Sequence, residues 1–241
     1  MSAFEDKTYW LIGASEGLGR EIARGLVDEG AHVIISARNE ERLNDLAAEL
    51  KNIRVLPLDV TDALGVRNAV ETMGPIDGLI YNAGAYVPMR ATEWDTDAAL
   101  RIMDVNFNGA QRVLGAVVPR LLAQGRGDIT LIGSLAGYRG LPAAIGYGAS
   151  KAALISLAET MRFDLKGTGV TVRIVNPGFI KTRLTDQNDF NMPMLMTPET
   201  AASHVLRAMK RRKFRTDFPR PFSTLIKVLD LLPDWIVYRG R

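Results

Sequence analysis

Short apolar runs alternate regularly with segments of helical periodicity, and this alternation restricts the fold more than any other feature of the sequence. The runs are hydrophobic at consecutive positions, as in strands that are covered on both faces. Strands that alternate with helices give a parallel sheet with helices on both sides. We therefore predict an α/β fold with a doubly wound parallel sheet. The expected strands are residues 7–12, 31–36, 53–58, 76–81, 128–133, 170–175 and a short edge strand at 214–218. The expected helices are 18–28, 39–51, 62–72, 95–123, one that begins near Tyr147 and ends near residue 166, and one that starts at 197.

The composition excludes several kinds of site. The 241-residue chain has no cysteine, which excludes disulfides, thiolate catalysis and cysteine-ligated metals. Its two histidines, His32 and His204, lie in unrelated segments, so we expect no histidine triad and no metal site. The N-terminus lacks the apolar region of a signal peptide, and no run of about 18 uncharged apolar residues occurs. We therefore expect a cytoplasmic protein.

A glycine-rich turn follows the first expected strand and reads Gly13-Ala-Ser15-Glu16-Gly17-Leu18-Gly19. Glycines let the chain turn tightly and let phosphate oxygens approach the backbone, while the next helix presents free N–H groups at its start. A turn of this kind favours a dinucleotide ligand, although its spacing is G-x-x-x-G-x-G rather than G-x-G-x-x-G. The alternative is that the glycines only serve a tight turn.

An arginine follows the second expected strand, where NAD enzymes usually carry an acid that binds the ribose. The guanidinium of Arg38 is placed to pair with a 2′-phosphate through two hydrogen bonds. We therefore predict that NADP(H) is preferred over NAD(H). Glu16 opposes this prediction, since an acid in the turn does not favour an additional phosphate. The alternative for Arg38 is a solvated charge at a helix start.

Tyr147 and Lys151 lie four residues apart at the start of an expected helix. This spacing puts both side chains on one face, about one turn apart. A nearby cation favours the phenolate, so we expect the pKa of Tyr147 to lie below its ordinary value of about 10. Such a tyrosine exchanges a proton near neutral pH. On these two residues alone, an ordinary helix is the preferred interpretation.

Taken together, these residues resemble the short-chain dehydrogenase/reductase family over residues 7–182, which implies a Rossmann-like single domain. The chain departs from the family pattern at Ile12, where threonine is usual, and at Tyr81, where asparagine is usual. The motifs that carry the resemblance, in chain order, are the glycine turn, Asp59-Val60, Tyr81-Asn82-Ala83-Gly84, Asn106, Ser134, Tyr147, Lys151 and Pro177-Gly178-Phe-Ile180-Lys-Thr182.

The resemblance implies hydride transfer between a nicotinamide and a carbonyl or alcohol carbon. Tyr147 would transfer the proton, and Ser134 would donate a hydrogen bond to the same oxygen. Lys151 would lower the tyrosine pKa and hold the nicotinamide ribose, and Asn106 would anchor a water that connects Lys151 to solvent. The structural alternatives are a loop cap for Ser134 and a helix kink for Asn106. The cofactor-binding residues that follow are Gly13, Ser15, Glu16, Gly17, Leu18, Gly19, Arg38, Asp59, Val60, Asn82, Ala83, Gly84, Tyr147, Lys151, Pro177, Gly178, Ile180 and Thr182.

Residues 183–197 form the segment that covers the substrate in this family. Their apolar side chains would make an adaptable lid that suits a hydrophobic carbonyl compound, although packing of the loop alone is an equal alternative. We place a dinucleotide-binding catalytic domain at residues 1–218, with this lid inside it. The lid candidates are Leu184, Phe190, Met192, Met194 and Met196, and further pocket candidates are Tyr86, Met89, Tyr138 and Leu141.

Residues 219–241 form a tail that extends the same domain and is too apolar between residues 221 and 238 to be free in water. It caps the substrate pocket, joins a dimer interface, or rests on an anionic membrane surface. Beside it, residues 207–220 hold seven basic side chains, Arg212 among them, against one acidic side chain. This patch lacks interleaved aromatics and a reading motif, so we expect no nucleic-acid partner.

We therefore predict an NADP(H)-dependent oxidoreductase that acts on a hydrophobic carbonyl compound or secondary alcohol and forms a homodimer or homotetramer. The alternative is a catalytically silent NADP(H)-binding sensor or scaffold protein, in contact with a membrane through its tail. The intact set of Asn106, Ser134, Tyr147 and Lys151 argues against that alternative, because a sensor does not need all four.

Overall fold

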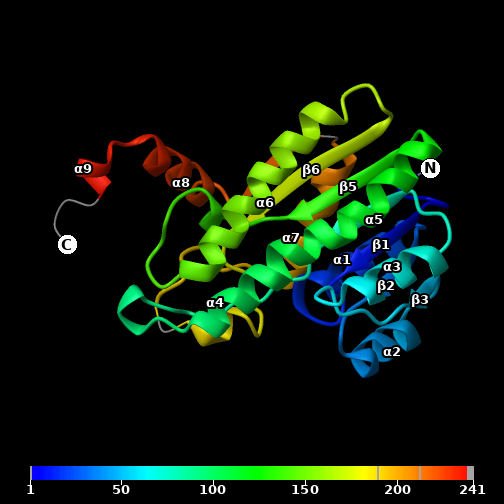
Figure 1. The fold of residues 1–241 in the computed structure, drawn as a ribbon, viewed down its shortest axis with the longest axis horizontal. Coiled ribbons are helices and arrows are strands. Elements are labelled where there is room, and N and C mark those ends of the chain that lie inside the picture. The colour runs from blue at the N-terminus through cyan, green and yellow to red at the C-terminus, as the bar shows by residue number, and fades with distance from the viewer. Residues whose placement is uncertain (1, 189, 212, 238–241) are drawn as a thin grey trace.

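The computed structural model of the chain describes residues 2–188, 190–211 and 213–237, and a seven-stranded parallel sheet forms its centre (Figure 1). The strand order β3-β2-β1-β4-β5-β6-β7 reverses between β1 and β4, which opens a crevice at the carboxyl ends of these strands. The predicted doubly wound sheet is confirmed, edge strand included. The strands are β1 Thr8–Ile12, β2 His32–Ser36, β3 Ile53–Val55, β4 Gly78–Tyr81, β5 Gly127–Ile132, β6 Val170–Pro177 and β7 Arg215–Phe218.

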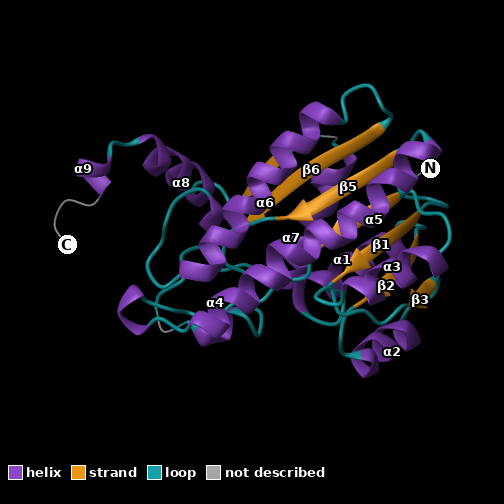
Figure 2. Cartoon of the chain, viewed as in Figure 1, coloured by secondary structure: helices purple, strands orange, loops and turns teal. Residues whose placement is uncertain are grey.

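Helices cover both faces of the sheet (Figure 2). On one face, α3, α5 and α6 enclose a core with Leu79 and Leu131, and on the other face α1, α2 and α7 enclose a core with Leu11 and Ile35. Strands buried on both faces explain the uninterrupted apolar runs of the sequence. The helices are α1 Gly17–Asp28, α2 Glu40–Glu49, α3 Ala63–Thr72, α4 Thr96–Met103, α5 Gly109–Gln124, α6 Ile145–Asp164, α7 Pro198–Lys210, α8 Phe222–Leu231 and α9 Asp234–Val237.

The glycine turn brings β1, α1 and the end of β4 into direct contact. Gly13 has a φ of +87°, and a Cβ atom there would lie 2.6 Å from the backbone nitrogen of Ala83. A Cβ atom on Gly19 would lie 2.0 Å from the Gly13 carbonyl oxygen, which also accepts a hydrogen bond from Asn82 Nδ2 at 2.8 Å. Only glycine at these two positions allows this approach.

The helix predicted over residues 95–123 is not continuous, and this prediction is wrong in that respect. A π-helical turn, Asp104–Asn108, separates α4 from α5, and the amide of Gly109 bonds the Asp104 carbonyl five residues back. Single π turns of this kind interrupt α-helices without changing their hydrophobic period much, and they occur often at functional sites. Periodicity therefore did not reveal the interruption.

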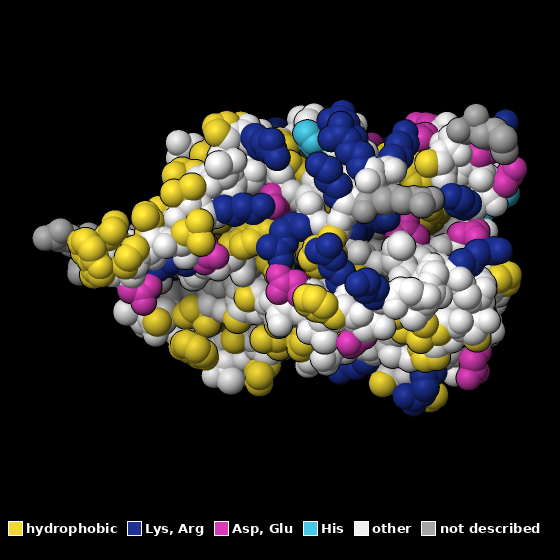
Figure 3. Space-filling view, turned by 90° about the horizontal axis from the view of Figure 1, so that it is seen from above, with side chains coloured by type: hydrophobic (Ala, Val, Ile, Leu, Met, Phe, Trp, Pro, Cys, Tyr) yellow, Lys and Arg dark blue, Asp and Glu magenta, His cyan; other side chains and the backbone are white. Residues whose placement is uncertain are grey.

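The tail forms α8 and α9, which extend away from the sheet (Figure 1). Hydrophobic side chains gather on this projecting end (Figure 3), and Leu231 and Trp235 there are 83% and 66% exposed. Within residues 2–188, 190–211 and 213–237, no helix is long and apolar enough to cross a membrane. The expected contributions of Arg212 to the basic patch and of Tyr238 to the tail lie outside the described residues.

Candidate functional site

A cavity of about 630 Å³ opens at the carboxyl ends of the strands, where the strand order reverses. Apart from Gly19, which packs behind the turn, every residue predicted to bind the cofactor lines it. These lining residues are Gly13, Ser15, Glu16, Gly17, Leu18, Arg38, Asp59, Val60, Asn82, Ala83, Gly84, Tyr147, Lys151, Pro177, Gly178, Ile180 and Thr182.

The outer part of the cavity suits the phosphates of a dinucleotide. The helix α1 begins at Gly17, and its N-cap residue Glu16 makes no side-chain capping hydrogen bond, so its first N–H groups are available to a ligand. Gly17 has a φ of +55°, and a Cβ atom there would lie 2.9 Å from Cγ2 of Thr182. A bare glycine backbone at a helix N-terminus is the arrangement that binds pyrophosphate.

Glu16 and three arginines line the cavity, and two of the arginines pair with Glu16. The Glu16 carboxylate forms an ion pair with Arg42 and a second one with Arg183, whose Nη2 lies 2.8 Å from Oε1. Both arginines line the cavity together with Arg38. Two guanidinium groups therefore balance the one carboxylate that opposed binding of a 2′-phosphate. Our sequence reasoning missed Arg42, although it lies four residues after Arg38, and it missed Arg183 in the lid.

Tyr147 and Lys151 line the cavity, and Ser134 lies beside Tyr147. The Ser134 hydroxyl is near enough to lower the pKa of Tyr147, and the Lys151 ammonium lies 5.7 Å from the centroid of the Tyr147 ring. Ser134 also accepts a hydrogen bond of 3.1 Å from the Ala136 amide, so it caps a 3₁₀ turn as well. The predicted shared face of Tyr147 and Lys151 is present in the structure.

Burial dominates the pKa values of both groups. It raises the pKa of Tyr147, with a smaller downward effect from the Ser134 hydrogen bond and an upward one from Tyr86. The expected lowering of this pKa by Lys151 is therefore wrong for this structure. Burial also lowers the pKa of Lys151 to about 8. Lys151 is only 4% exposed, and its ammonium donates a hydrogen bond of 2.8 Å to the Ile132 carbonyl.

Asn106 is fully buried inside the π turn and connects two parts of the site. Its Oδ1 accepts a hydrogen bond of 2.6 Å from the Ala85 amide, and its Nδ2 donates to the Ala85 carbonyl and to Ser150 Oγ, at 3.0 and 2.9 Å. The Asn106 side chain thus satisfies the backbone groups of Ala85, as expected from the structural alternative of a helix kink. It also contacts the residue that precedes Lys151.

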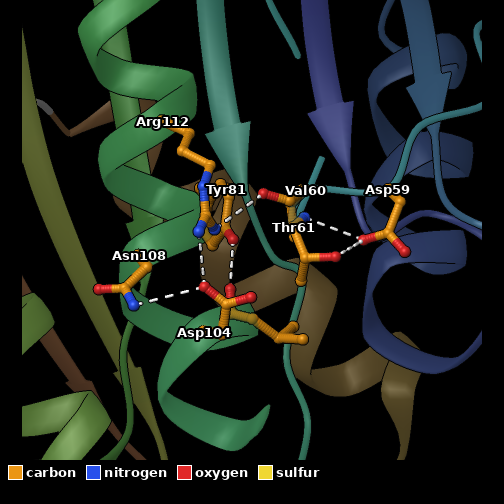
Figure 4. Close-up of polar contacts among 8 residues, drawn as sticks. Asp59, Val60, Thr61, Tyr81, Asp104, Asn108 and Arg112 are labelled. Carbon is orange, nitrogen blue, oxygen red and sulfur yellow. Dashed lines mark hydrogen bonds and ion pairs between the residues drawn. The ribbon is translucent and has the colours of Figure 1, made fainter. Parts of the chain in front are cut away.

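The segment with the cofactor-binding candidates Asp59 and Val60 lies next to this π turn (Figure 4). Asp59 Oδ1 accepts hydrogen bonds from the Thr61 amide and hydroxyl at 2.9 and 2.8 Å, which fixes the carboxylate. The Val60 carbonyl accepts a hydrogen bond of 3.3 Å from Arg112, a residue of α5. The loop after β3 is therefore tied to the start of α5.

One aromatic ring lies against Tyr147, and a group of three phenylalanines includes one from the lid and one from the tail. The Tyr86 ring lies edge-on to Tyr147, with centroids 5.1 Å apart. Phe179 lies between Phe190 of the lid and Phe222 of the tail, at centroid distances of 5.7 and 5.8 Å. The lid and the tail therefore each place a ring against Phe179. Sequence reasoning missed Phe179, although it stands inside the motif that was used.

Three other pocket candidates lie inside the fold. Met196 is 9% exposed, belongs to the core under α7 and pairs with Ile180, so it is not part of an apolar lid. Met89 is also buried. The Tyr138 hydroxyl donates a hydrogen bond of 2.7 Å to Asp217 of β7. Met89 and Met196 therefore belong to the packed interior, and Tyr138 is tied to the edge strand.

Comparisons with known proteins agree with this geometry. The family description "short chain dehydrogenase" matches residues 7–192. An uncharacterized oxidoreductase from Myxococcus xanthus is 33% identical, and the match covers 97% of this chain and 96% of that protein. An uncharacterized oxidoreductase from Staphylococcus epidermidis is 30% identical, and the match covers 87% of this chain and 93% of that protein.

Two solved structures have the same fold. A short chain dehydrogenase from Burkholderia cenocepacia in complex with NADP is 26% identical with a TM-score of 0.85, and the match covers 93% of this chain and 92% of that one. A short-chain dehydrogenase from Sphingobium yanoikuyae in complex with NADPH has the same identity and coverage and a TM-score of 0.84. The chain therefore belongs to the short-chain dehydrogenase/reductase family and is a nicotinamide-dependent oxidoreductase.

Proposed function

We propose that this protein is an NADP(H)-dependent oxidoreductase that transfers a hydride between the nicotinamide and the carbonyl or secondary-alcohol carbon of a hydrophobic small molecule. One observation carries the proposal. Tyr147 and Lys151 line a cavity that also holds a glycine turn and three arginines, and Ser134 lies beside Tyr147. A proton-transfer group thus lies beside a dinucleotide cradle.

The nicotinamide, when bound, supplies or accepts the hydride. Tyr147 donates the proton to the carbonyl oxygen in reduction and removes it from the alcohol in oxidation. Ser134 donates a hydrogen bond to the same oxygen and so stabilises the charge that develops there. Because burial raises the Tyr147 pKa, its hydroxyl is protonated at neutral pH in this form of the protein, as reduction requires.

Lys151 and Asn106 support the proton transfer. The Lys151 pKa of about 8 lets the ammonium release and regain a proton near neutral pH. Asn106 holds Ser150, the residue before Lys151, and the backbone of Ala85. We propose that these two residues restore the proton that Tyr147 gives up.

The preference for NADP(H) rests on charge. Arg38, Arg42 and Arg183 line the cavity, and Glu16, the acid of the glycine turn, is already balanced by Arg42 and Arg183. A surplus of guanidinium groups favours a phosphate over a ribose hydroxyl. The similar structures from Burkholderia and Sphingobium that hold NADP and NADPH support this preference.

The proposal that the substrate is hydrophobic is based on the aromatic side chains of Tyr86, Phe179, Phe190 and Phe222. We place one catalytic domain at residues 1–218, and we propose that the tail, residues 219–241, completes its substrate pocket through Phe222. The exposed apolar face of the tail suits a homo-oligomer interface or a membrane surface. The sensor or scaffold alternative is not favoured, because the four predicted catalytic residues are intact.

The reaction is tested by NADPH oxidation with a panel of hydrophobic ketones and aldehydes. Tyr147→Phe removes only the acidic hydroxyl, so kcat is expected to fall by about 10²- to 10⁴-fold. NADPH binding, measured by fluorescence titration, is expected to stay within about twofold, which shows that the fold and the cradle persist. Turnover that survives Tyr147→Phe would contradict the mechanism.

The cofactor preference is tested by Arg38→Asp. Loss of a charge-assisted contact costs about 1.5–3 kcal/mol, so KM for NADPH is expected to rise by about 10- to 100-fold. KM for NADH is expected to change little. Arg101→Asp, an exposed arginine of α4, is the matched control and is expected to affect neither cofactor. Equal effects of Arg38→Asp on the two cofactors would refute the role of Arg38.

The buried ammonium is tested by the pH dependence of stability. The folded pKa of Lys151, about 8, lies below the unfolded value of 10.5. Between these values the unfolded chain binds more protons, so the wild type gains stability as pH rises, whereas below pH 8 the cost of burial is fully present. Relative to Lys151→Met, its free energy of unfolding is expected to rise by about 2 kcal/mol from pH 7 to pH 10. Urea denaturation measures this difference.

Lys166→Met, which changes an exposed lysine, is the control for this pH series. Its stability difference from the wild type is expected to stay constant over the same range. A constant difference for Lys151→Met as well would mean that the ammonium is not desolvated.

A further inference from the structure

The Val105 carbonyl inside the π turn lacks the donor that a regular α-helix would give it. In an α-helix the Gly109 amide would bond Val105, four residues back, but here it bonds Asp104 instead. The Tyr81 hydroxyl donates a hydrogen bond of 2.6 Å to the Val105 carbonyl (Figure 4). A side chain from the end of β4 thus takes the place of the helix donor.

Tyr81 is held tightly in this position. Its side chain is fully buried. A Cβ atom on Gly109 would lie 2.6 Å from the Tyr81 hydroxyl and 2.8 Å from Cγ2 of Val60. Glycine at position 109 is therefore needed to leave room for the tyrosine. The sequence departs from the family pattern at this tyrosine, so the contact is a property of this chain.

A second set of contacts holds the π turn from the other side. Asp104 Oδ1 accepts hydrogen bonds from Arg112 at 2.7 Å and from Asn108 at 3.3 Å (Figure 4). Arg112 also donates to the Val60 carbonyl. These contacts fix where the turn lies, but none of them reaches the carbonyl that the π geometry leaves without its helix donor. The Tyr81 contact alone, among those drawn in Figure 4, meets that group.

Asn106 directly follows Val105, so the geometry of this turn sets where its amide points. Each residue of an α-helix rotates the next by about 100°, and a π turn accommodates one more residue than an α turn. Conversion of the turn to α geometry would therefore redirect the Asn106 side chain. Its hydrogen bonds to Ala85 and Ser150 would then be lost.

We propose that Tyr81 is a positioning residue for the proton-transfer site, whose hydroxyl stabilises the π turn that directs Asn106 toward Ala85 and Ser150. The kinetic consequence rests on the proposed function, whereas the structural consequence does not.

The test uses Tyr81→Phe with two independent measurements. The first is hydrogen exchange of the Ala85 amide by NMR, because this amide donates directly to Asn106. Its exchange is expected to become at least about tenfold faster, while amides of the core strands change much less. The second is the kcat of carbonyl reduction, which is expected to fall about tenfold because Asn106 would be misplaced. KM for NADPH is expected to stay within about twofold of the wild-type value.

Tyr9→Phe is the matched control, since Tyr9 is also a buried tyrosine but lies in β1, away from the π turn. It is expected to leave Ala85 exchange and kcat unchanged. Gly109→Ala is the second variant, because the added methyl group would displace the Tyr81 hydroxyl. It is expected to reproduce both the faster Ala85 exchange and the lower kcat.

The outcomes separate the two proposals. Faster Ala85 exchange in a protein that reduces no carbonyl compound would uphold the role of Tyr81 and overturn the proposed function. Ala85 exchange and kcat that match Tyr9→Phe in both variants would overturn the role of Tyr81. A loss of thermal stability with unchanged kcat and Ala85 exchange would likewise reduce Tyr81 to a packing residue.

Discussion

The contact between the Gly13 backbone and its neighbours on α1 and β4 is the constraint on which the rest of the site depends. A methyl group at Gly13 would meet the Ala83 backbone, and one at Gly19 would meet the Gly13 carbonyl. With these atoms absent, the helix start, the turn and the segment after β4 close around one cavity at the reversal of the strand order. The polar groups of the site are carried on strand ends and helix starts, which are rigid.

The residues of the proposed proton-transfer site also satisfy hydrogen-bonding groups of the fold. Ser134 caps a 3₁₀ turn, and Asn106 pairs with both backbone groups of Ala85. Lys151 differs, because its ammonium is buried against one carbonyl and its pKa falls to about 8. Burial of a charge costs stability, and a group held at such a cost is typical of a functional site. The fold thus accepts a local loss of stability at the place where we propose that proton transfer occurs.

Features that depend on local chemistry could be predicted from the sequence. The buried strands follow from apolar runs, and the cradle follows from glycines before a helix. The π turn at Asp104–Asn108 could not be predicted, since one inserted residue hardly changes the hydrophobic period. The pairing of Glu16 with Arg42 and Arg183 joins three separate segments, and no local pattern records it. The raised Tyr147 pKa was missed because spacing reveals a nearby lysine but not the depth of burial.

The central claim is that hydride passes directly between the nicotinamide and a carbonyl carbon while Tyr147 supplies the proton. The most direct measurement uses NADPH deuterated at the transferable C4 position with a hydrophobic ketone, in ordinary water. The account predicts that the deuterium appears on the carbinol carbon of the product and that the hydroxyl proton comes from solvent. Deuterium lost to water, or consumption of NADPH without a deuterated alcohol, would contradict the account.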